Sequence, residues 1–229
     1  MADEVDSTDP ALDYDEIGEA VSIPGNKSAQ TRKRILDTAA LVFSRKGFSR
    51  TRLADIAKVA EIKTGSIYYH FASREELTSE VMARGVNQIF KTVMASLDKL
   101  PEDTDSLTRL TTAIKVHLRC LIERGDYARA NTKLNGQVPK HIQALHSSNE
   151  AKYGEVWRKL LRDAAANGQL RQDLNLSAIR MFILGAMSWS VEWYKPENGP
   201  AASVAHDFSE MVLNGLIAPA PPLGTDKSA

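Results

Sequence analysis

Residues 63–70 bring together side chains that suit contact with DNA. The segment reads Lys-Thr-Gly-Ser-Ile-Tyr-Tyr-His. Gly65 and Ser66 are small enough for a helix to enter the major groove, while Tyr68, Tyr69 and His70 are long enough to reach bases or phosphates. The free N–H groups at the start of such a helix also attract phosphate. The segment therefore predicts a recognition helix.

Other kinds of site chemistry find little support in the sequence. The chain has one cysteine, Cys120, which excludes an intrachain disulfide and a cysteine-based zinc site. Of its five histidines only His141 and His146 are close in sequence, and no phosphate-binding loop, nucleophile elbow or dinucleotide fingerprint is present. We therefore expect no enzyme activity, no cofactor and no metal site. We expect Cys120 to be an inert buried thiol.

The charges of the chain are strongly segregated, although its net charge is zero. Residues 1–26 hold eight acids and no base, residues 27–74 hold eleven bases and three acids, and residues 75–229 hold 18 of each. A compact block with a charge of +8 is typical of a nucleic-acid-binding segment. The alternative is a solvated helix face, which charge alone does not exclude.

The pattern of apolar residues predicts an all-α fold with about nine helices and no sheet, since these residues recur at helical spacing. Gly47 ends the first helix, and Thr51 is the expected N-cap of the second. Ser73 is the expected N-cap of a long helix that reaches residue 98. Three helix breakers are expected to divide 125–146 into short helical pieces, namely Gly125, Gly136 and Pro139.

These features divide the chain into four parts. A three-helix helix-turn-helix domain is followed by a helical bundle that serves effector binding and dimerisation. The two ends are predicted to be disordered tails, because one is acidic and the other is rich in Pro and Ala. The predicted parts are residues 1–26 (acidic tail), 27–74 (DNA-binding domain), 75–217 (effector and dimerisation domain) and 218–229 (second tail).

Residues 52–77, RLADIAKVAEIKTGSIYYHFASREEL, together with RILDTAALVFSRKGFSRT at 34–51, resemble the DNA-binding domain of TetR-family repressors. The resemblance implies a homodimer that places one recognition helix of each subunit in a major groove of a palindromic operator. Thr51 would contact phosphate, and Tyr69, His70 and Arg74 would hold the DNA backbone. The other implied DNA-contacting residues are Arg50, Arg52, Lys63, Thr64, Gly65, Ser66 and Tyr68.

Three later stretches are similar to TetR-family regulators that sense acyl-CoA thioesters and govern fatty-acid or steroid degradation. They read RGDYARANTKLNGQVPKHIQ, SWSVEWYKPENGP and HDFSEMVLNGL. The implied effector is acyl-CoA-like or another lipophilic compound, which requires an apolar tunnel and cations for phosphate. Candidate effector-binding residues are Phe90, Met94, His117, Cys120, Leu121, Arg124, Trp157, Met187 and Trp189. Candidate phosphate partners besides Arg124 are Arg158, Arg162 and Arg180.

The last two predicted helices carry apolar residues on more sides than one neighbour can cover. We interpret this excess as a dimer interface in which four helices meet across a two-fold axis. The alternative is a helix that is fully internal to one subunit. The predicted interface residues are Phe182, Ile183, Ala186, Trp193, Phe208, Met211 and Val212.

Two other functions remain open at the level of sequence. An activator of the same fold would share every DNA-binding feature, and a helical protein–protein adaptor would have lost DNA binding. The basic block of residues 27–74 argues against the adaptor. No apolar run is long enough to cross a bilayer, and the acidic start differs from a secretory signal, so we expect a cytoplasmic protein without a membrane partner.

Overall fold

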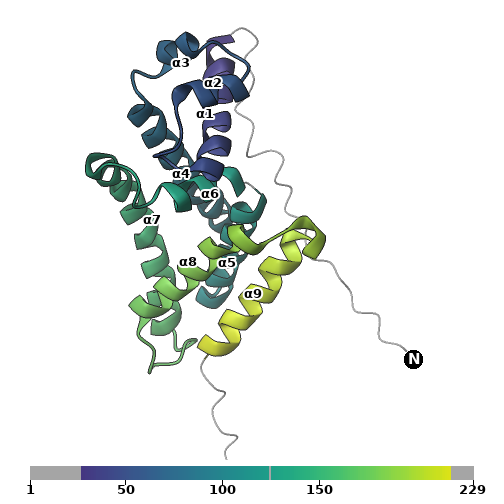
Figure 1. Ribbon diagram of the computed structural model, residues 1–229. Helices are drawn as coiled ribbons and strands as arrows, with labels where there is room; N and C mark the ends of the chain where they lie inside the picture. The colour runs from purple at the N-terminus through teal and green to yellow at the C-terminus, as the bar shows by residue number, and fades with distance from the viewer. Residues whose placement is uncertain (1–26, 124, 218–229) are drawn as a thin grey trace, which may run out of the picture.

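The computed structural model describes residues 27–123 and 125–217, and it confirms the all-α fold. Within these ranges the only strand-like pairing is an isolated bridge between Leu170 and Ile217. None of the described helices is long and apolar enough to cross a membrane. The helices, shown in Figure 1, are α1 (Lys27–Lys46), α2 (Leu53–Val59), α3 (Thr64–His70), α4 (Arg74–Asp98), α5 (Ser106–Glu123), α6 (Gly125–Leu134), α7 (Lys140–Ala166), α8 (Leu176–Trp193), the 3₁₀ turn η1 (Pro196–Asn198) and α9 (Ala201–Leu216).

Local side-chain chemistry explains where α4 begins. The hydroxyl of Ser73 accepts a hydrogen bond from the N–H of Glu76 at 3.0 Å, as the sequence predicted. The Glu76 carboxylate in turn accepts from the N–H of Ala72 at 2.6 Å. These contacts satisfy backbone donors that the helix itself leaves unpaired. The start of the 25-residue helix that leaves the DNA-binding region is therefore fixed.

The start of α2 differs from the prediction. Its N-cap is Arg52, and the carboxylate of Asp55 accepts from the Arg52 N–H at 2.9 Å. Thr51 lies one residue earlier and is completely buried, with its hydroxyl donating to the carbonyl oxygen of Gly47 at 2.7 Å. Thr51 therefore closes the turn after α1 instead of capping α2.

Helix α7 is longer than expected. Gly136 takes a left-handed conformation with φ of 79° after α6, and Pro139 is the N-cap of α7. From Lys140 the helix continues to Ala166 without a break. The prediction of short pieces across 125–146 was wrong for residues 140–146, because proline is compatible with a helix start and no helix breaker follows it before Gly154.

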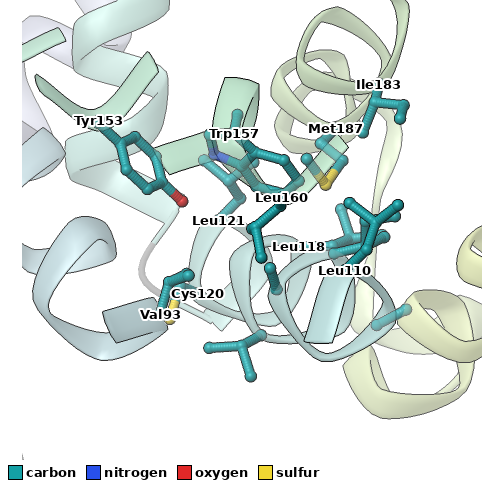
Figure 2. Close-up of a cluster of buried hydrophobic side chains, with 14 of the residues drawn as sticks. Val93, Leu110, Leu118, Cys120, Leu121, Tyr153, Trp157, Leu160, Ile183 and Met187 are labelled. Atoms are coloured by element: carbon teal, nitrogen blue, oxygen red, sulfur yellow. The ribbon is translucent and has the colours of Figure 1, made fainter. Parts of the chain in front are cut away.

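Two hydrophobic cores share α4. The first core joins α1, α2 and α3 to the first half of α4, where it includes Leu77, Val81 and Met82, and it also takes residues from α6. The second core joins the last half of α4 to α5, α7, α8 and α9. Figure 2 shows part of this second core, in which Trp157 of α7 packs among aliphatic side chains of α5 and α8. The first core extends past residue 74 into α4 and α6. The predicted boundary between 27–74 and 75–217 would therefore divide one core, and it stays a prediction.

Candidate functional site

Helix α3 is held against α2 by a tight turn and by two buried side chains. Glu61 takes a left-handed conformation with φ of 53°, which allows the N–H of Ile62 to donate to the carbonyl of Ala57 at 3.0 Å. Ile67 and Phe71 are buried in the first core. This arrangement anchors one side of α3, which lies at one end of the molecule (Figure 1). The remaining sides are available for contact with a partner.

The exposed part of α3 carries the residues that the sequence assigned to DNA. Tyr68 is 58% exposed and Tyr69 is 81% exposed. The ring of His70 meets Tyr69 edge to face, with 5.0 Å between ring centroids. Nothing lies within 4 Å of the position that a Cβ on Gly65 would take, so the helix start is sterically open. Thr64 and Ser66 are partly exposed beside it, and Lys63 is exposed at the N-cap.

Exposed basic side chains lie in the same helix-turn-helix. Arg50 and Arg52 lie exposed just before α2. Neither Arg50 nor Lys63 forms an ion pair with a described residue, whereas Lys46 is paired with Asp55 at 3.2 Å. The N–H of Arg52 and then Lys46 hold the pKa of the Asp55 carboxyl below its usual value. Arg50 and Lys63 therefore remain free for phosphate, which is the group that dominates binding to nucleic acid.

Thr51 is buried and Arg74 is half-buried, and both side chains bond to backbone carbonyls of the helix-turn-helix. The hydroxyl of Thr51 is buried and donates to Gly47, and its N–H donates to the carbonyl of Phe48 at 3.2 Å. The guanidinium of Arg74 donates to the carbonyl of Thr51 at 3.0 Å and stacks 4.0 Å above the ring of Phe48. Both residues therefore stabilise the helix-turn-helix. We correct the assignment of the buried Thr51 as a direct DNA contact, and we expect Arg74 to act through these contacts within the fold.

A cavity of about 440 Å³ lies among α4, α5, α6, α7 and α8. Its apolar wall includes Ile89, Leu121 and Leu184. A cavity of this size and character falls within the range of small-molecule sites. Of the predicted effector-binding residues, the lining contains His117 and Leu121.

The other predicted effector-binding residues lie elsewhere. Phe90, Met94, Cys120, Trp157 and Met187 belong to the second core or pack against it. Trp189 is 62% exposed and does not line the cavity, because it lies two residues beyond the buried Met187 on α8. Arg124 lies outside the described residues.

The sequence missed several polar groups of the cavity wall. Tyr153 and Asn131 were not predicted, and Arg180 was considered only as a phosphate partner. The side-chain oxygen Oδ1 of Asn131 and the Nε of Arg180 are buried without a hydrogen-bond partner among the described residues. A signal was present in α6, where polar residues at 131, 132 and 135 share one side of the helix. These unpaired polar atoms are suited to a bound molecule, because buried polar groups normally have partners.

His117 and Tyr153 form a hydrogen-bonded pair in the cavity wall. The Nδ1 of His117 lies 2.5 Å from the Tyr153 hydroxyl, and the two rings stack with 5.6 Å between centroids. Burial lowers the pKa of His117 to about 3 and raises the pKa of Tyr153. Both side chains are therefore uncharged at neutral pH. Tyr153 is labelled in Figure 2 beside Cys120 and Trp157.

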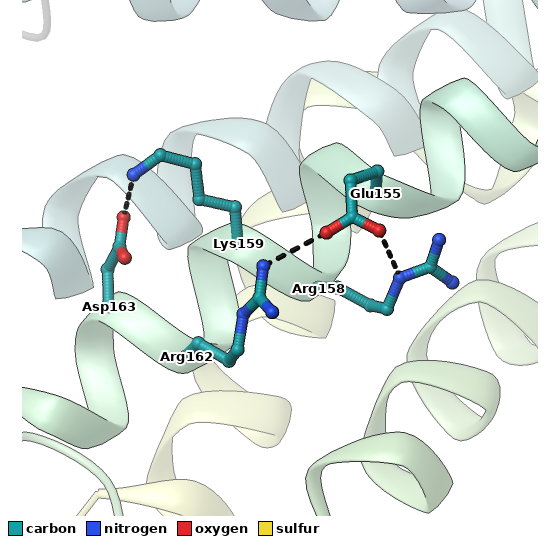
Figure 3. A network of polar contacts seen from close by, with 5 residues as sticks. All are labelled: Glu155, Arg158, Lys159, Arg162 and Asp163. Atoms are coloured by element: carbon teal, nitrogen blue, oxygen red, sulfur yellow. Dashed lines mark hydrogen bonds and ion pairs between the residues drawn. The ribbon is translucent and has the colours of Figure 1, made fainter.

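The outer surface of α7 carries an arginine-rich network beyond the cavity (Figure 3). The carboxylate of Glu155 accepts from Arg158 at 2.6 Å and from Arg162 at 2.9 Å. These ion pairs hold the pKa of the Glu155 carboxyl below its usual value. Lys159 pairs with Asp163 at 2.5 Å on the same helix. Arg158 and Arg162 are exposed and do not line the cavity.

Helices α8 and α9 expose large apolar side chains. Phe182 is 75% exposed and Met211 is 77% exposed, and Met181, Trp189 and Trp193 are also exposed. Ala186 is exposed, and Phe208 and Val212 are half-buried, so these predicted interface residues remain available to a partner. Ile183 is only 4% exposed and belongs to the second core of its own subunit. We therefore move Ile183 from the interface to the core. We call the exposed set, Met181, Phe182, Ala186, Trp189, Trp193 and Met211, the α8–α9 apolar surface.

The fold and the site together define a helix-turn-helix regulator with a separate helical region that contains a cavity. Residues 35–81 match the family model of the bacterial regulatory proteins of the tetR family, and residues 103–216 match the tetracyclin repressor-like C-terminal domain. The chain belongs to the TetR family of transcriptional regulators. It is accordingly a regulator and not an enzyme.

Individual relatives cover most of the chain. The transcriptional repressor KstR2 of Mycolicibacterium smegmatis is 28% identical over 198 residues, which are 83% of this chain and 93% of the relative. The solved structure of the ketosteroid regulator KstR2 of Mycobacterium tuberculosis has a TM-score of 0.73 at 25% identity, covering 82% and 95% of the two chains. AibR, solved with isovaleryl coenzyme A and operator DNA, has a TM-score of 0.69 at 19% identity, covering 83% and 100%. The AibR likeness shows the shared fold.

Proposed function

We propose that this chain is a homodimeric transcriptional repressor that binds a palindromic operator through α3 and is released by a small lipophilic effector. One observation carries the proposal. Helix α3 is anchored by Ile67 and Phe71 while Tyr68 and Tyr69 extend from it into solvent, inside the block of residues 27–74 that carries a charge of +8. Exposed aromatic hydroxyls next to free cations suit the combination of base and phosphate contacts that DNA-binding proteins use.

The α8–α9 apolar surface supports the dimer. Several large side chains there lie mostly in solvent, and surfaces of this kind mark contacts with a partner. A second copy of the same surface would cover them across a two-fold axis. The axis would then place two α3 helices about 34 Å apart, in successive major grooves on one side of the duplex. Binding to chromosomal operator DNA would place the protein in the cytoplasm.

The cavity among α4–α8 supports the effector. Its mixed wall of aliphatic and polar groups accepts an apolar molecule and orients it. An acyl-CoA thioester is the effector class that we favour, because AibR has been solved with isovaleryl coenzyme A. The acyl part would lie in the cavity and the larger coenzyme part would extend beyond it, since a cavity of about 440 Å³ is too small for a whole CoA thioester.

Two helices can carry the signal from the cavity to α3. Helix α4 lines the cavity with Val86 and Ile89 and leads back to the helix-turn-helix. Helix α6 lines the cavity with Asn131 and packs against α1 on its other side, where Tyr127 bonds to Asp37. An effector that binds one arrangement of these helices more tightly than the other shifts the population toward it.

A DNA-binding experiment tests this function. The affinity of the purified protein for the DNA upstream of its own gene would be measured with and without a panel of acyl-CoA thioesters and the matching free acids. We expect binding that weakens steeply with salt and that one thioester releases. Tyr69→Phe should reduce operator affinity several-fold without changing thermal stability. Loss of DNA binding in every condition would refute the regulator, and transcription that rises on binding would identify an activator.

A further inference from the structure

We infer that the effector carries two separate polar groups on an apolar body: an uncharged oxygen that hydrogen-bonds the His117–Tyr153 pair, and an anionic group that binds Arg180. The inference rests on the proposed function, because it takes the cavity as the effector site. It adds the chemical class of the ligand and the residues that recognise each end of it.

The His117–Tyr153 pair is suited to an uncharged oxygen. If the Tyr153 hydroxyl donates to Nδ1, its oxygen can still accept from a ligand hydroxyl. If Nδ1–H donates to Tyr153, the tyrosine hydroxyl is free to donate to a ligand carbonyl. The pair can therefore bind either a carbonyl or a hydroxyl through a change of tautomer. A charged group there would lose its hydration without meeting an opposite charge, since both residues are buried and neutral.

Arg180 supplies the charge for the second group. It lines the cavity from α8, and its buried Nε has no partner among the described residues. Its Nη1 lies 3.6 Å from the position that a Cβ on Gly154 would take, and the Nη1 of Arg158 lies at the same distance from that point. Arg180 therefore lies against α7 beside Gly154, close to the guanidinium group of Arg158.

The balance of charge around Gly154 favours an anion. Arg158 and Arg162 share a single carboxylate, that of Glu155, so this part of α7 keeps an excess of positive charge next to Arg180. Glu150 also lines the cavity from α7, so the cavity wall holds a carboxylate as well as the guanidinium of Arg180. Arginine is well suited to carboxylate and phosphate because it can donate two parallel hydrogen bonds.

Four short probes separate the two ends of the ligand. They are an oxo-octanoate with its ketone at the far end of the chain from the carboxylate, the corresponding hydroxy-octanoate, plain octanoate and a methyl ketone of the same length. Their affinities would be measured by calorimetry on the wild type, Tyr153→Phe and Arg180→Gln. Tyr127→Phe and Arg171→Gln are matched controls, because neither residue lines the cavity. Thermal denaturation would confirm that each variant is folded.

We expect the oxo and hydroxy acids to bind about tenfold more tightly than octanoate, an advantage that Tyr153→Phe removes. We expect them to bind about ten- to a hundredfold more tightly than the methyl ketone, an advantage that Arg180→Gln removes. Both controls should keep both preferences. Any of three results would overturn the inference. The protein could bind octanoate and its oxo derivative equally, both variants could keep the preferences, or the oxo acid could fail to bind.

A second measurement distinguishes failure of the ligand assignment from failure of the proposed function. Operator affinity would be measured with the tightest probe on the same preparations. If the probes bind in the predicted pattern but operator affinity does not change, the ligand assignment stands and the ligand is not an effector. Release of the operator by a probe that lacks the predicted pattern would retain the effector function and refute the ligand assignment.

Discussion

The hydroxyl of Tyr127 donates a hydrogen bond of 2.8 Å to the carboxylate of Asp37, which joins α6 to α1. Lys133 of α6 donates to the carbonyls of Ser44 and Arg45 at the end of α1, at 3.2 and 3.1 Å. The same helix supplies Asn131 to the cavity. A movement of α6 on effector binding would therefore displace α1, the first helix of the DNA-binding region, through these contacts.

Tyr127→Phe should weaken the response to effector more than it weakens binding to DNA. The change removes one hydrogen bond between α6 and α1, which is worth about 0.5–1.5 kcal/mol, while the ring stays in place. The operator affinity of the free protein should stay within about threefold of the wild type, and more effector should be needed for half-release. Fluorescence anisotropy with labelled operator measures both quantities. Tyr194→Phe is the control, because its hydroxyl donates to the carbonyl of Gly199 and its ring packs against the second core, which contains no residue of α1. Equal effector response in both variants would contradict a role for this contact.

Arg74→Met should lower stability and leave the salt dependence of DNA binding unchanged. The substitution removes the hydrogen bond to the carbonyl of Thr51 and the stacking on Phe48, which together stabilise the fold by about 1–3 kcal/mol. Chemical denaturation measures the first effect, and operator titrations at several salt concentrations measure the second.

Arg50→Met provides the matched comparison with Arg74→Met. Arg50 is exposed and makes no ion pair with a described residue, so its loss should change stability by no more than about 0.5 kcal/mol. The slope of log affinity against log salt should fall by about one. A lowered slope for Arg74→Met with unchanged stability would restore Arg74 as a direct phosphate contact.

The recognition helix and the start of α4 were predictable because their signals are local. Small residues at the start of α3, aromatic hydroxyls after them and Ser73 before α4 each act within a few residues of their own position. The roles of Arg74 and Thr51 depend on contacts with Phe48 and Gly47, which helix periodicity does not specify. A motif can therefore locate a helix-turn-helix correctly and still misassign a buried residue, such as Thr51, that stabilises it.

The cavity was harder to predict because its wall depends on the rotation of five helices. Met187 is buried and Trp189 is exposed, although both are large apolar residues on α8. Side chains two residues apart on a helix point about 200° away from each other. A small error in the assumed rotation of the helix therefore exchanges residues of the cavity wall with residues of the surface. By its spacing Tyr153 is an apolar position of a helix, and its pairing with His117 depends on the packing of α5 against α7.

Glutamate at two positions of the α8–α9 apolar surface should convert the dimer to a monomer. Phe182→Glu and Met211→Glu replace side chains that are mostly exposed in one subunit, so each monomer should keep its fold. In a dimer, each unpaired carboxylate that becomes buried costs about 3–5 kcal/mol. Sedimentation velocity measures the change in mass. Ala166→Glu, at the exposed end of α7, should leave the mass unchanged. If the glutamate variants keep the mass of the wild-type dimer, the interface lies elsewhere.

Mild acid should destabilise the protein through His117. Burial lowers the pKa of His117 to about 3, whereas an unfolded chain binds this proton near pH 6.5. The unfolded state therefore binds more protons as the pH falls below 6.5, and stability should drop by about 2 kcal/mol at pH 5. Denaturation curves at pH 7 and pH 5 measure the difference, which should shrink in His117→Gln. His206→Gln serves as the control because His206 is exposed. An unchanged pH dependence in His117→Gln would show that another group causes the loss.

The first hydrophobic core limits how such a regulator can be recombined. Ala130 and Leu134 of α6 complete the packing around Ile35 and Phe43 of α1, together with Leu77 and Val81 of α4. A DNA-reading segment transplanted at residue 74 onto another regulator would arrive without these partners. New pairings of operator and ligand, whether engineered or acquired by gene fusion, should therefore succeed only when the facing side of α6 is transferred together with the helix-turn-helix.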